Sequence, residues 1–190
     1  FRLVRDGLIA AGLVEACNVI AAEPAPHADL LLVHTPEYLD DLEHLRWTHR
    51  TRMSELPLSA EIVRAYVVAA GGTTRAAREA LTRGVAVHLG GGFHHAFADL
   101  ASGFCSINDL AVAIRVAQRD GRIRRAAVVD CDLHQGNGTA HRFQGDAQVF
   151  TFSIHQEHLY PVKERSTVDI GLENGVRDEE FNRRLAETLP

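Results

Sequence analysis

Short apolar runs that alternate with helical segments are the feature that most constrains how this chain can fold. Three of them, residues 85–89, 126–132 and 149–155, are apolar along most of their length rather than at every second position. Strands of this kind are buried on both faces, as in a parallel sheet covered by helices. The sequence therefore predicts an α/β fold, with a doubly wound, mostly parallel sheet and helices on both faces.

The remaining segments predict further elements around this sheet. Thr35 followed by Pro36 is typical of a helix start, because threonine caps the first turn and proline fits its first position. The other expected elements are a helix over 3–20, a short strand over 30–33, a helix from 59 to 83 interrupted at Gly71–Gly72, and helices over 107–119 and 178–188.

The chain shows no sign of an internal boundary. No repeat, linker or low-complexity tract divides its 190 residues, so we expect residues 1–190 to form a single domain. The first residue is Phe1, the one methionine is Met53, and an expected helix stands directly before Pro190. We therefore expect a partial domain, cut at both ends from a longer protein.

Composition excludes several classes of protein. The formal net charge of −5 argues against a nucleic-acid binder, and no apolar run approaches the ~20 residues of a membrane helix. Cys17, Cys105 and Cys131 are odd in number and widely spaced, so neither a disulfide framework nor a cysteine zinc site is indicated. We expect a cytoplasmic protein with no direct nucleic-acid or membrane partner. A basic cluster at Arg122, Arg124 and Arg125 is explained by a solvated turn.

Polar side chains follow the expected strands where ligands bind in such sheets, at the carboxyl ends. Asp130, Asp132 and His134 alternate along one strand end and should point to the same side. Two carboxylates and an imidazole packed together need a positive partner. Asp132 and His134 would suit Zn²⁺ or Fe²⁺, with Asp130 behind them. The alternative is that the aspartates cap the strand end and His134 is an ordinary loop histidine.

A second histidine-bearing segment comes after three glycines. His94 and His95 are adjacent, and buried adjacent imidazoles must each find a partner or lose hydration without compensation. Beside a metal they would form an acid/base pair that titrates near neutral pH. Taken alone, the pair favours structural or solvated histidines over a catalytic pair.

Three linked motifs resemble those of the zinc-dependent histone deacetylase family. They are residues 91–96 (Gly-Gly-Phe-His-His-Ala), 103–109 (Gly-Phe-Cys-Ser-Ile-Asn-Asp) and 130–139 (Asp-Cys-Asp-Leu-His-Gln-Gly-Asn-Gly-Thr). Segments 34–39, 153–155 and 160–161 fit further blocks, so the resemblance spans essentially the whole chain. Gln135 and Asn137 stand where many members carry His and Asp. This indicates the branch of bacterial histone deacetylase-like amidohydrolases and acetoin utilisation proteins, or class IV-like members.

The resemblance implies a role for each matching residue. Asp132 and His134 would bind zinc, and His94 and His95 would be the acid/base groups. A structural K⁺ or Na⁺ ion would be held by Asp130, Asp132, His134, Ser153 and Ile154, and the wall of an acetyl-lysine tunnel would include Gly103 and Phe104. Without the family context, Phe104 would be interpreted as a core aromatic.

The implied activity is removal of an acetyl group from acetylated lysine or a related small N-acetyl amine. Asp130 would orient His94, and Asn137 would orient His95. A carboxylate partner favours the imidazolium form and an amide does not, so His95 is expected to be the general base and His94 the more often protonated partner. The family's third zinc ligand, an aspartate, and its carbonyl-binding tyrosine have no match before Pro190. We therefore expect the 190-residue chain alone to bind metal weakly and to be inactive.

Two other functions remain open. An arginase-like binuclear metallohydrolase would need a carboxylate two residues after the metal-binding histidine, where this chain has Gly136. A catalytically inactive module could keep the tunnel only to bind acetylated ligands.

Overall fold

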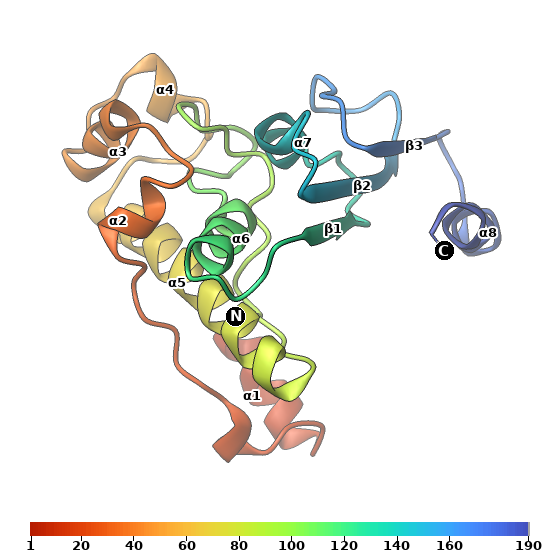
Figure 1. The fold of residues 1–190 in the computed structure, drawn as a ribbon, viewed down its shortest axis with the longest axis horizontal. Coiled ribbons are helices and arrows are strands. Elements are labelled where there is room, and N and C mark those ends of the chain that lie inside the picture. The colour runs from red at the N-terminus through yellow and green to blue at the C-terminus, as the bar shows by residue number, and fades with distance from the viewer. Residues whose placement is uncertain (190) are drawn as a thin grey trace.

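The computed structural model describes residues 1–189 and forms an α/β arrangement in which three strands lie beside a group of helices (Figure 1). Parallel pairing requires long crossover connections. α7 lies in the one between β1 and β2, whereas residues 157–167 connect β2 to β3 without a helix. In chain order the elements are α1 (Arg2–Ala10), η1 (Ala16–Asn18), α2 (His27–Leu30), α3 (Pro36–Glu43), α4 (His49–Arg52), α5 (Ala60–Arg83), α6 (Asp109–Arg119), β1 (Ala126–Asp130), α7 (Asn137–Phe143), β2 (Val149–Gln156), β3 (Val168–Leu172) and α8 (Asp178–Thr188).

The sheet is parallel throughout, in the order β1-β2-β3. Its register places Asp130 at the end of β1 opposite Ser153 of β2, and Ser153 opposite Asp169 of β3. Three polar side chains therefore lie side by side across the sheet near the carboxyl end of β1. The predicted α/β class and parallel pairing are confirmed.

Helices lie on both faces of this open sheet. Phe152 and Ile154 of β2 form one apolar cluster with Leu172, and Phe181 and Leu185 of α8 pack against it. A second, larger cluster joins α3, α5 and α6 to Phe143 of α7 and Val149 of β2. α5 and α6 pack closely against each other, and Figure 1 shows both on the β1 side of the molecule.

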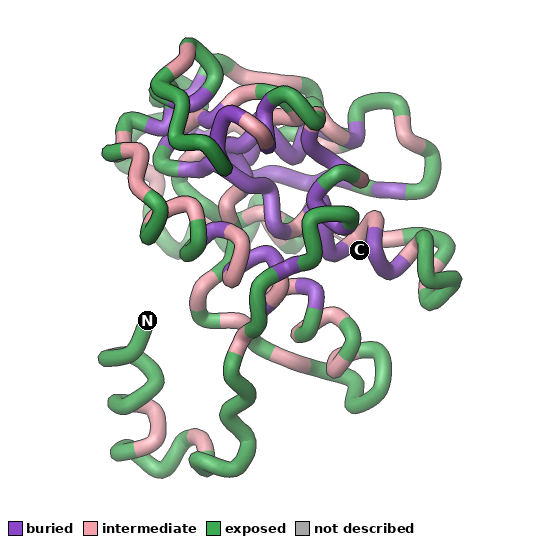
Figure 2. The backbone as a smooth tube through the Cα atoms, turned by 90° about the vertical axis from the view of Figure 1, so that its left-hand side faces the viewer, coloured by how far each residue is buried: buried purple, intermediate pink, exposed green. Residues whose placement is uncertain are grey.

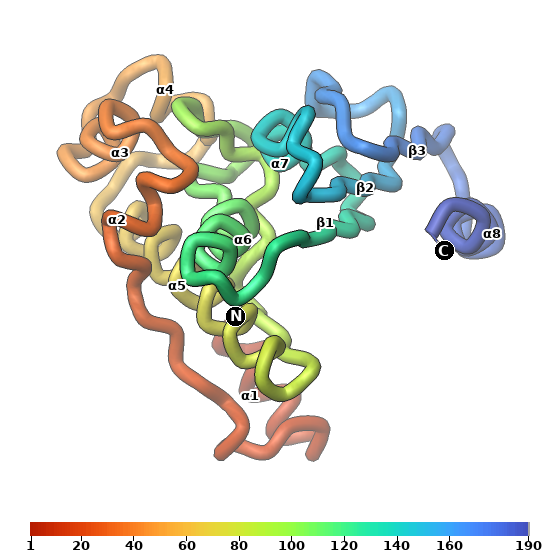
Figure 3. The backbone as a smooth tube through the Cα atoms, in the orientation of Figure 1, coloured from red at the N-terminus to blue at the C-terminus, as the bar shows by residue number. Residues whose placement is uncertain are grey.

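The N-terminal segment stands apart from this core. α1 buries no residue, and Figure 2 shows it as a mostly exposed arm at the end of a long exposed connection. Figure 3 traces that connection from η1 up to α2, where burial begins. Within residues 1–189, no helix has the length and apolar character needed to cross a membrane.

Two expected strands are not formed. Residues 30–33 are the end of α2 and a helical turn, in which Val33 and His34 donate backbone hydrogen bonds to the Leu30 carbonyl. A short apolar run does not distinguish a strand from a buried helical turn. Residues 85–89 are irregular, with Val85 76% and Val87 80% exposed. The described residues offer this segment no neighbouring strand, so its backbone has no ladder to join.

The helix predictions are mostly confirmed, with differences at particular residues. The helices from Pro36, over Asp109–Arg119 and over Asp178–Thr188 form as expected. The helix expected over 3–20 is wrong in length, because α1 ends at Ala10 and only a 3₁₀ turn follows. Gly71 and Gly72 do not break α5, because α5 packs closely there: a Cβ at Gly71 would lie 1.8 Å from the Glu23 carbonyl oxygen. β3 was not predicted.

Replacing Leu42 of α3 tests the larger apolar cluster. Leu42 is 2% exposed, so Leu42→Ala should lower the free energy of unfolding by about 2–5 kcal/mol through lost burial and a residual cavity. Urea unfolding followed by circular dichroism measures this. Leu81→Ala is the matched control, because Leu81 is 46% exposed and should change stability by less than ~0.5 kcal/mol. Equal losses in the two variants would contradict this assignment of the core.

Candidate active site

The tandem histidines lie on an irregular loop beside the carboxyl end of β1. His94 and His95 are 8% and 4% exposed, and their ring centroids are 4.1 Å apart. The His134 ring lies 6.1 Å from that of His95. The three imidazoles predicted to lie together are therefore close in space, although His134 comes 40 residues after His94 in the chain.

His94 is paired with a carboxylate. Its Nδ1 lies 2.6 Å from Oδ2 of Asp130, the last residue of β1. Burial alone would lower the pKa of His94, but the hydrogen bond and charge of Asp130 outweigh it, and the pKa is raised above the ordinary value. Burial pushes the pKa of Asp130 upward, and the contacts with His94 more than reverse this, so that pKa is lowered. The pair therefore favours an imidazolium next to a carboxylate.

His95 is paired with an amide. Its Nδ1 lies 2.8 Å from Oδ1 of Asn137, the first residue of α7. The Gly138 amide donates to the same oxygen, which identifies it as an acceptor, so His95 donates from Nδ1. Burial, followed by the charge of His94, lowers the pKa of His95 to about 4. His95 is thus neutral at pH 7, with a free electron pair on Nε2.

Asp132 and His134 lie next to this pair. The His134 amide donates to Oδ1 of Asp132 at 2.8 Å, and Nδ1 of His134 lies 3.6 Å from the same oxygen. Both side chains remain accessible, at 53% for Asp132 and 37% for His134. A carboxylate oxygen and an imidazole nitrogen are ligands that zinc accepts. Among residues 1–189, no group of three or more His, Cys, Asp and Glu side chains is arranged to hold a metal ion.

Gly136 leaves no room for a further carboxylate at this strand end. A Cβ at this position would lie 2.4 Å from Oδ2 of Asp130 and 3.1 Å from Nδ1 of His94. A side chain there would displace the His94–Asp130 pair. A carboxylate here, the second metal ligand of an arginase-like site, would therefore require the His94–Asp130 pair to move.

Gly103 and Phe104 border the histidines on another side. A Cβ at Gly103, whose φ is +50°, would lie 2.5 Å from Cδ2 of His95. Phe104 also has a positive φ, and its backbone is held by Ser54 and Tyr66. Its side chain is 58% exposed, which shows that Phe104 is not a core aromatic.

Tyr160, which belongs to the 160–161 block of the family resemblance but was given no role there, also lies in the site. Its ring centroid is 5.2 Å from that of His95 and 5.9 Å from that of His134. The Tyr160 hydroxyl is hydrogen-bonded to Oγ of Ser102 at 2.7 Å. Its membership of the 160–161 block and its place just after the histidine-bearing end of β2 are the sequence signals that point to it.

Two residues of the expected monovalent-cation site, Ser153 and Ile154, lie on β2, the strand that pairs with the end of β1 at Asp130. Ser153 is directly opposite Asp130 in register, and Ile154 is fully buried next to it. Oγ of Ser153 contacts Nδ1 of His155 at 2.9 Å. Asp130 Oδ1 accepts from the Asp132 amide, so its carboxylate already has protein partners.

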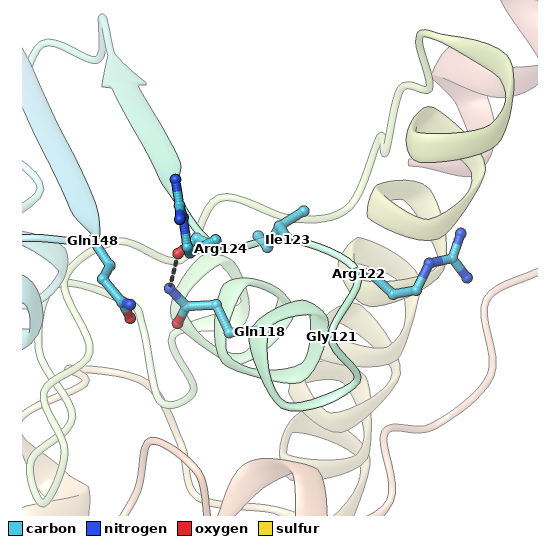
Figure 4. Close-up of a pocket in the computed structure, with 6 residues that line it drawn as sticks. All are labelled: Gln118, Gly121, Arg122, Ile123, Arg124 and Gln148. Atoms are coloured by element: carbon cyan, nitrogen blue, oxygen red, sulfur yellow. Dashed lines mark hydrogen bonds between the residues drawn. The ribbon is translucent and has the colours of Figure 1, made fainter.

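Two hollows lie near this part of the sheet. The larger, about 870 Å³, is bounded by β1, α5 and α6 and includes His94, Asp130 and Asp132 in its lining. The smaller, about 370 Å³, lies at the turn from α6 into β1, at the opposite end of that strand (Figure 4). There Nε2 of Gln118 donates to the Arg124 carbonyl, while Arg122 extends away. Arg122 and Arg124 therefore do not point toward a common site.

Removing the charge of Asp130 tests the electrostatics of the pair. Asp130→Asn keeps a hydrogen-bond acceptor but leaves burial as the main influence, so the pKa of His94 should fall below its ordinary value. Stability contributed by the raised pKa is present below pH ~6.5 and is lost as the pH rises through the folded-state pKa, and the variant should lose that contribution. NMR titration of histidine ring protons measures the pKa. Asp146→Asn, which removes a carboxylate paired with Arg115, is the control. An unchanged pKa in Asp130→Asn would contradict the pairing.

Comparison with known proteins agrees with this geometry. A model described as the histone deacetylase domain matches residues 1–190. The chain is 41% identical to an uncharacterized protein of Picosynechococcus sp., covering all of this chain and 64% of that protein. It is 31% identical to histone deacetylase 2 of Arabidopsis thaliana, covering 96% of this chain and 50% of that protein.

The solved structures show the same relation. A crystal structure of a histone deacetylase homolog from Aquifex aeolicus matches with a TM-score of 0.84 and 29% identity, over 96% of this chain and 55% of that one. The chain thus spans about half to two thirds of the length of these relatives. The match over its whole length shows that this chain belongs to the histone deacetylase family.

Proposed function

We propose that the protein carrying this chain is a zinc-dependent hydrolase that removes acetyl groups from acetylated lysine or a related small N-acetyl amine. The observation that carries the proposal is the unequal pairing of the adjacent histidines. His94 contacts a carboxylate, His95 contacts an amide, and both lie beside Asp132 and His134. Hydrolysis of an amide needs a group that takes a proton and one that stabilises charge, and this pairing supplies both.

Asp132 and His134 would hold the zinc ion. The donor set fits, because one carboxylate and one imidazole are adjacent and accessible. When bound, zinc supplies Lewis acidity toward a carbonyl oxygen and lowers the pKa of water. Fe²⁺ is the alternative for the same oxygen and nitrogen ligands. Ser153, Ile154 and the carbonyls of Asp132 and His134 would hold K⁺ or Na⁺ next to Asp130, which the register of β1 and β2 supports.

The two histidines would divide the proton transfers. His95 donates from Nδ1 to Asn137, so Nε2 is free to take a proton from the attacking water. His94, held in its charged form by Asp130, would stabilise negative charge beside it. The pair would then return a proton to the leaving amine. Neutral His95 next to charged His94 would thus leave His95 free to take a proton at pH 7.

The substrate would approach past Phe104 and Tyr160. Phe104 is largely exposed, and Tyr160 packs edge-on against His95. The Gly103 backbone lies so close to the His95 ring that it could form one wall of a narrow substrate passage, because a glycine adds no side chain there. An apolar approach past Phe104 to the polar histidines would suit the aliphatic stem of an acetylated amine. Protein acetyl-lysine and small acetylated amines both fit this chemistry.

A binding module without activity is the second candidate, in which the tunnel would serve only for recognition. The intact pairing of both histidines favours the enzyme, because binding alone does not require it.

Exchanging each histidine in the full-length protein tests their roles. His95→Phe should lower kcat by about 10²–10⁴-fold through loss of the base, and His94→Phe should lower it by less. Acetate release from acetyl-lysine peptides and from acetylated polyamines, assayed in parallel, provides the measurement. A larger loss in His94→Phe would contradict the assigned roles. Bound zinc without acetate release from either substrate would overturn the proposed substrate class.

Zinc binding by residues 1–190 alone tests the completeness of the ligand set. Two protein ligands make a weak site, so we propose that this chain binds zinc poorly and releases no acetate, whereas the full-length protein retains one zinc through dialysis. Elemental analysis after dialysis measures the content. Asp132→Asn in the full-length protein should lose zinc, and Asp146→Asn should keep it. Tight stoichiometric zinc in residues 1–190 would contradict the proposal.

A further inference from the structure

We propose that Asp109 is a positioning residue for the tandem histidines: its buried carboxylate holds the backbone directly before them, and so sets where both imidazoles lie. Asn108 holds the backbone directly after them. Neither residue touches the reacting groups. The catalytic consequence of this inference rests on the proposed function, whereas its structural part does not.

The carboxylate of Asp109 accepts hydrogen bonds from two consecutive backbone amides. The Phe93 amide donates to Oδ1 at 2.7 Å, and the Gly92 amide lies 3.1 Å from Oδ1 and 3.0 Å from Oδ2. The loop that carries the histidines belongs to no helix or strand, so its amides have no ladder to satisfy them. Asp109 therefore satisfies these amides and fixes the direction in which the chain enters His94.

Asp109 is itself firmly held. It is fully buried, and it is the first residue of α6, where the helix dipole favours a negative charge. The Thr73 hydroxyl of α5 also donates to Oδ2. Because this hydroxyl gives its one proton to Asp109, it accepts from Nδ1 of His88 at 2.8 Å. The carboxylate thus links α5, α6 and the histidine loop.

The preceding residue secures the other end of the loop. Nδ2 of Asn108 donates to the Ala96 carbonyl at 3.2 Å and to Oγ1 of Thr139 at 3.0 Å. The Thr139 amide donates in turn to the His94 carbonyl at 3.0 Å. Oδ1 of Asn108 caps α6 by accepting from the Ala111 amide. The first turn of α6 therefore holds the chain both before and after His94 and His95.

This arrangement explains how adjacent residues reach partners on different elements. His94 must meet Asp130 at the end of β1, while His95 must meet Asn137 at the start of α7. The two contacts, at 2.6 Å and 2.8 Å, leave little freedom for the backbone between them. A shift of the Gly92–Phe93 peptide would move both rings, and misplacements of about 1 Å cost up to ~10²-fold in rate.

The test is Asp109→Asn in the full-length protein. Asparagine has the same shape, but it replaces one acceptor oxygen with an amino group that faces hydrogen-bond donors. We expect the hydrogen-bonded Nδ1–H proton signal of His94, observed by NMR in ¹⁵N-histidine-labelled protein, to broaden or shift. We also expect kcat to fall at least about tenfold, with KM for an acetyl-lysine peptide within about twofold and zinc content unchanged. Asp120→Asn, at the opposite end of α6, is the matched control and should alter none of these.

A folded Asp109→Asn variant that keeps the His94 signal and kcat would overturn the inference. If that variant does not fold, Thr73→Val and Thr73→Ser decide, because they remove or keep the hydroxyl that donates to Asp109. The inference requires Thr73→Val to perturb the His94 signal and Thr73→Ser to preserve it, and equal spectra would refute it. If the wild-type protein releases no acetate, the proposed function fails, while the NMR comparison still decides the role of Asp109.

Discussion

The two hydrogen bonds made by the adjacent imidazoles are the interactions on which the rest of the site depends. His94 Nδ1 is bound to Asp130 and His95 Nδ1 to Asn137, and these two partners give neighbouring rings opposite charge preferences. In one shared environment, two adjacent histidines would have similar pKa values. Their pKa values differ here because a strand end supplies the carboxylate partner of His94 and a helix start supplies the amide partner of His95.

The parallel sheet brings those partners together. Asp130 ends β1, and the loop after it carries Asp132 and His134 before α7 begins at Asn137. The hydrogen-bond partners of both tandem histidines and the two candidate metal ligands therefore come from one short stretch of chain, residues 130–137. The tandem histidines come from a separate loop, and the first turn of α6 holds that loop by both its ends. The site is thus built where a strand end and a helix start meet.

The local chemistry was predictable where one stretch of sequence carries both the residues and their spacing. Asp130, Asp132 and His134 follow an apolar strand, and this pattern alone indicated a strand-end site. The family resemblance supplied the partners of His94 and His95, and the structure shows both contacts. The role of Asp109 was hidden, because an Asn-Asp pair before an amphipathic helix has the pattern of a simple cap. Tyr160 was part of a matching block, but its contact with His95 was not predicted because a loop without periodicity does not show where its side chains lie.

Local patterns in the sequence were enough to predict the parallel α/β class, the helices from Pro36 and Asp178, the helix that ends at Arg119, and a set of candidate site residues. These follow from local patterns of apolar residues, caps and motifs. The three-dimensional structure was needed to show that residues 30–33 form a helical turn, that residues 85–89 are irregular, and that α5 continues unbroken through Gly71. For residues 85–89 and for α5 the outcome depends on neighbours far along the chain. A strand needs a hydrogen-bonded partner, and a glycine pair stays helical where another segment packs against it.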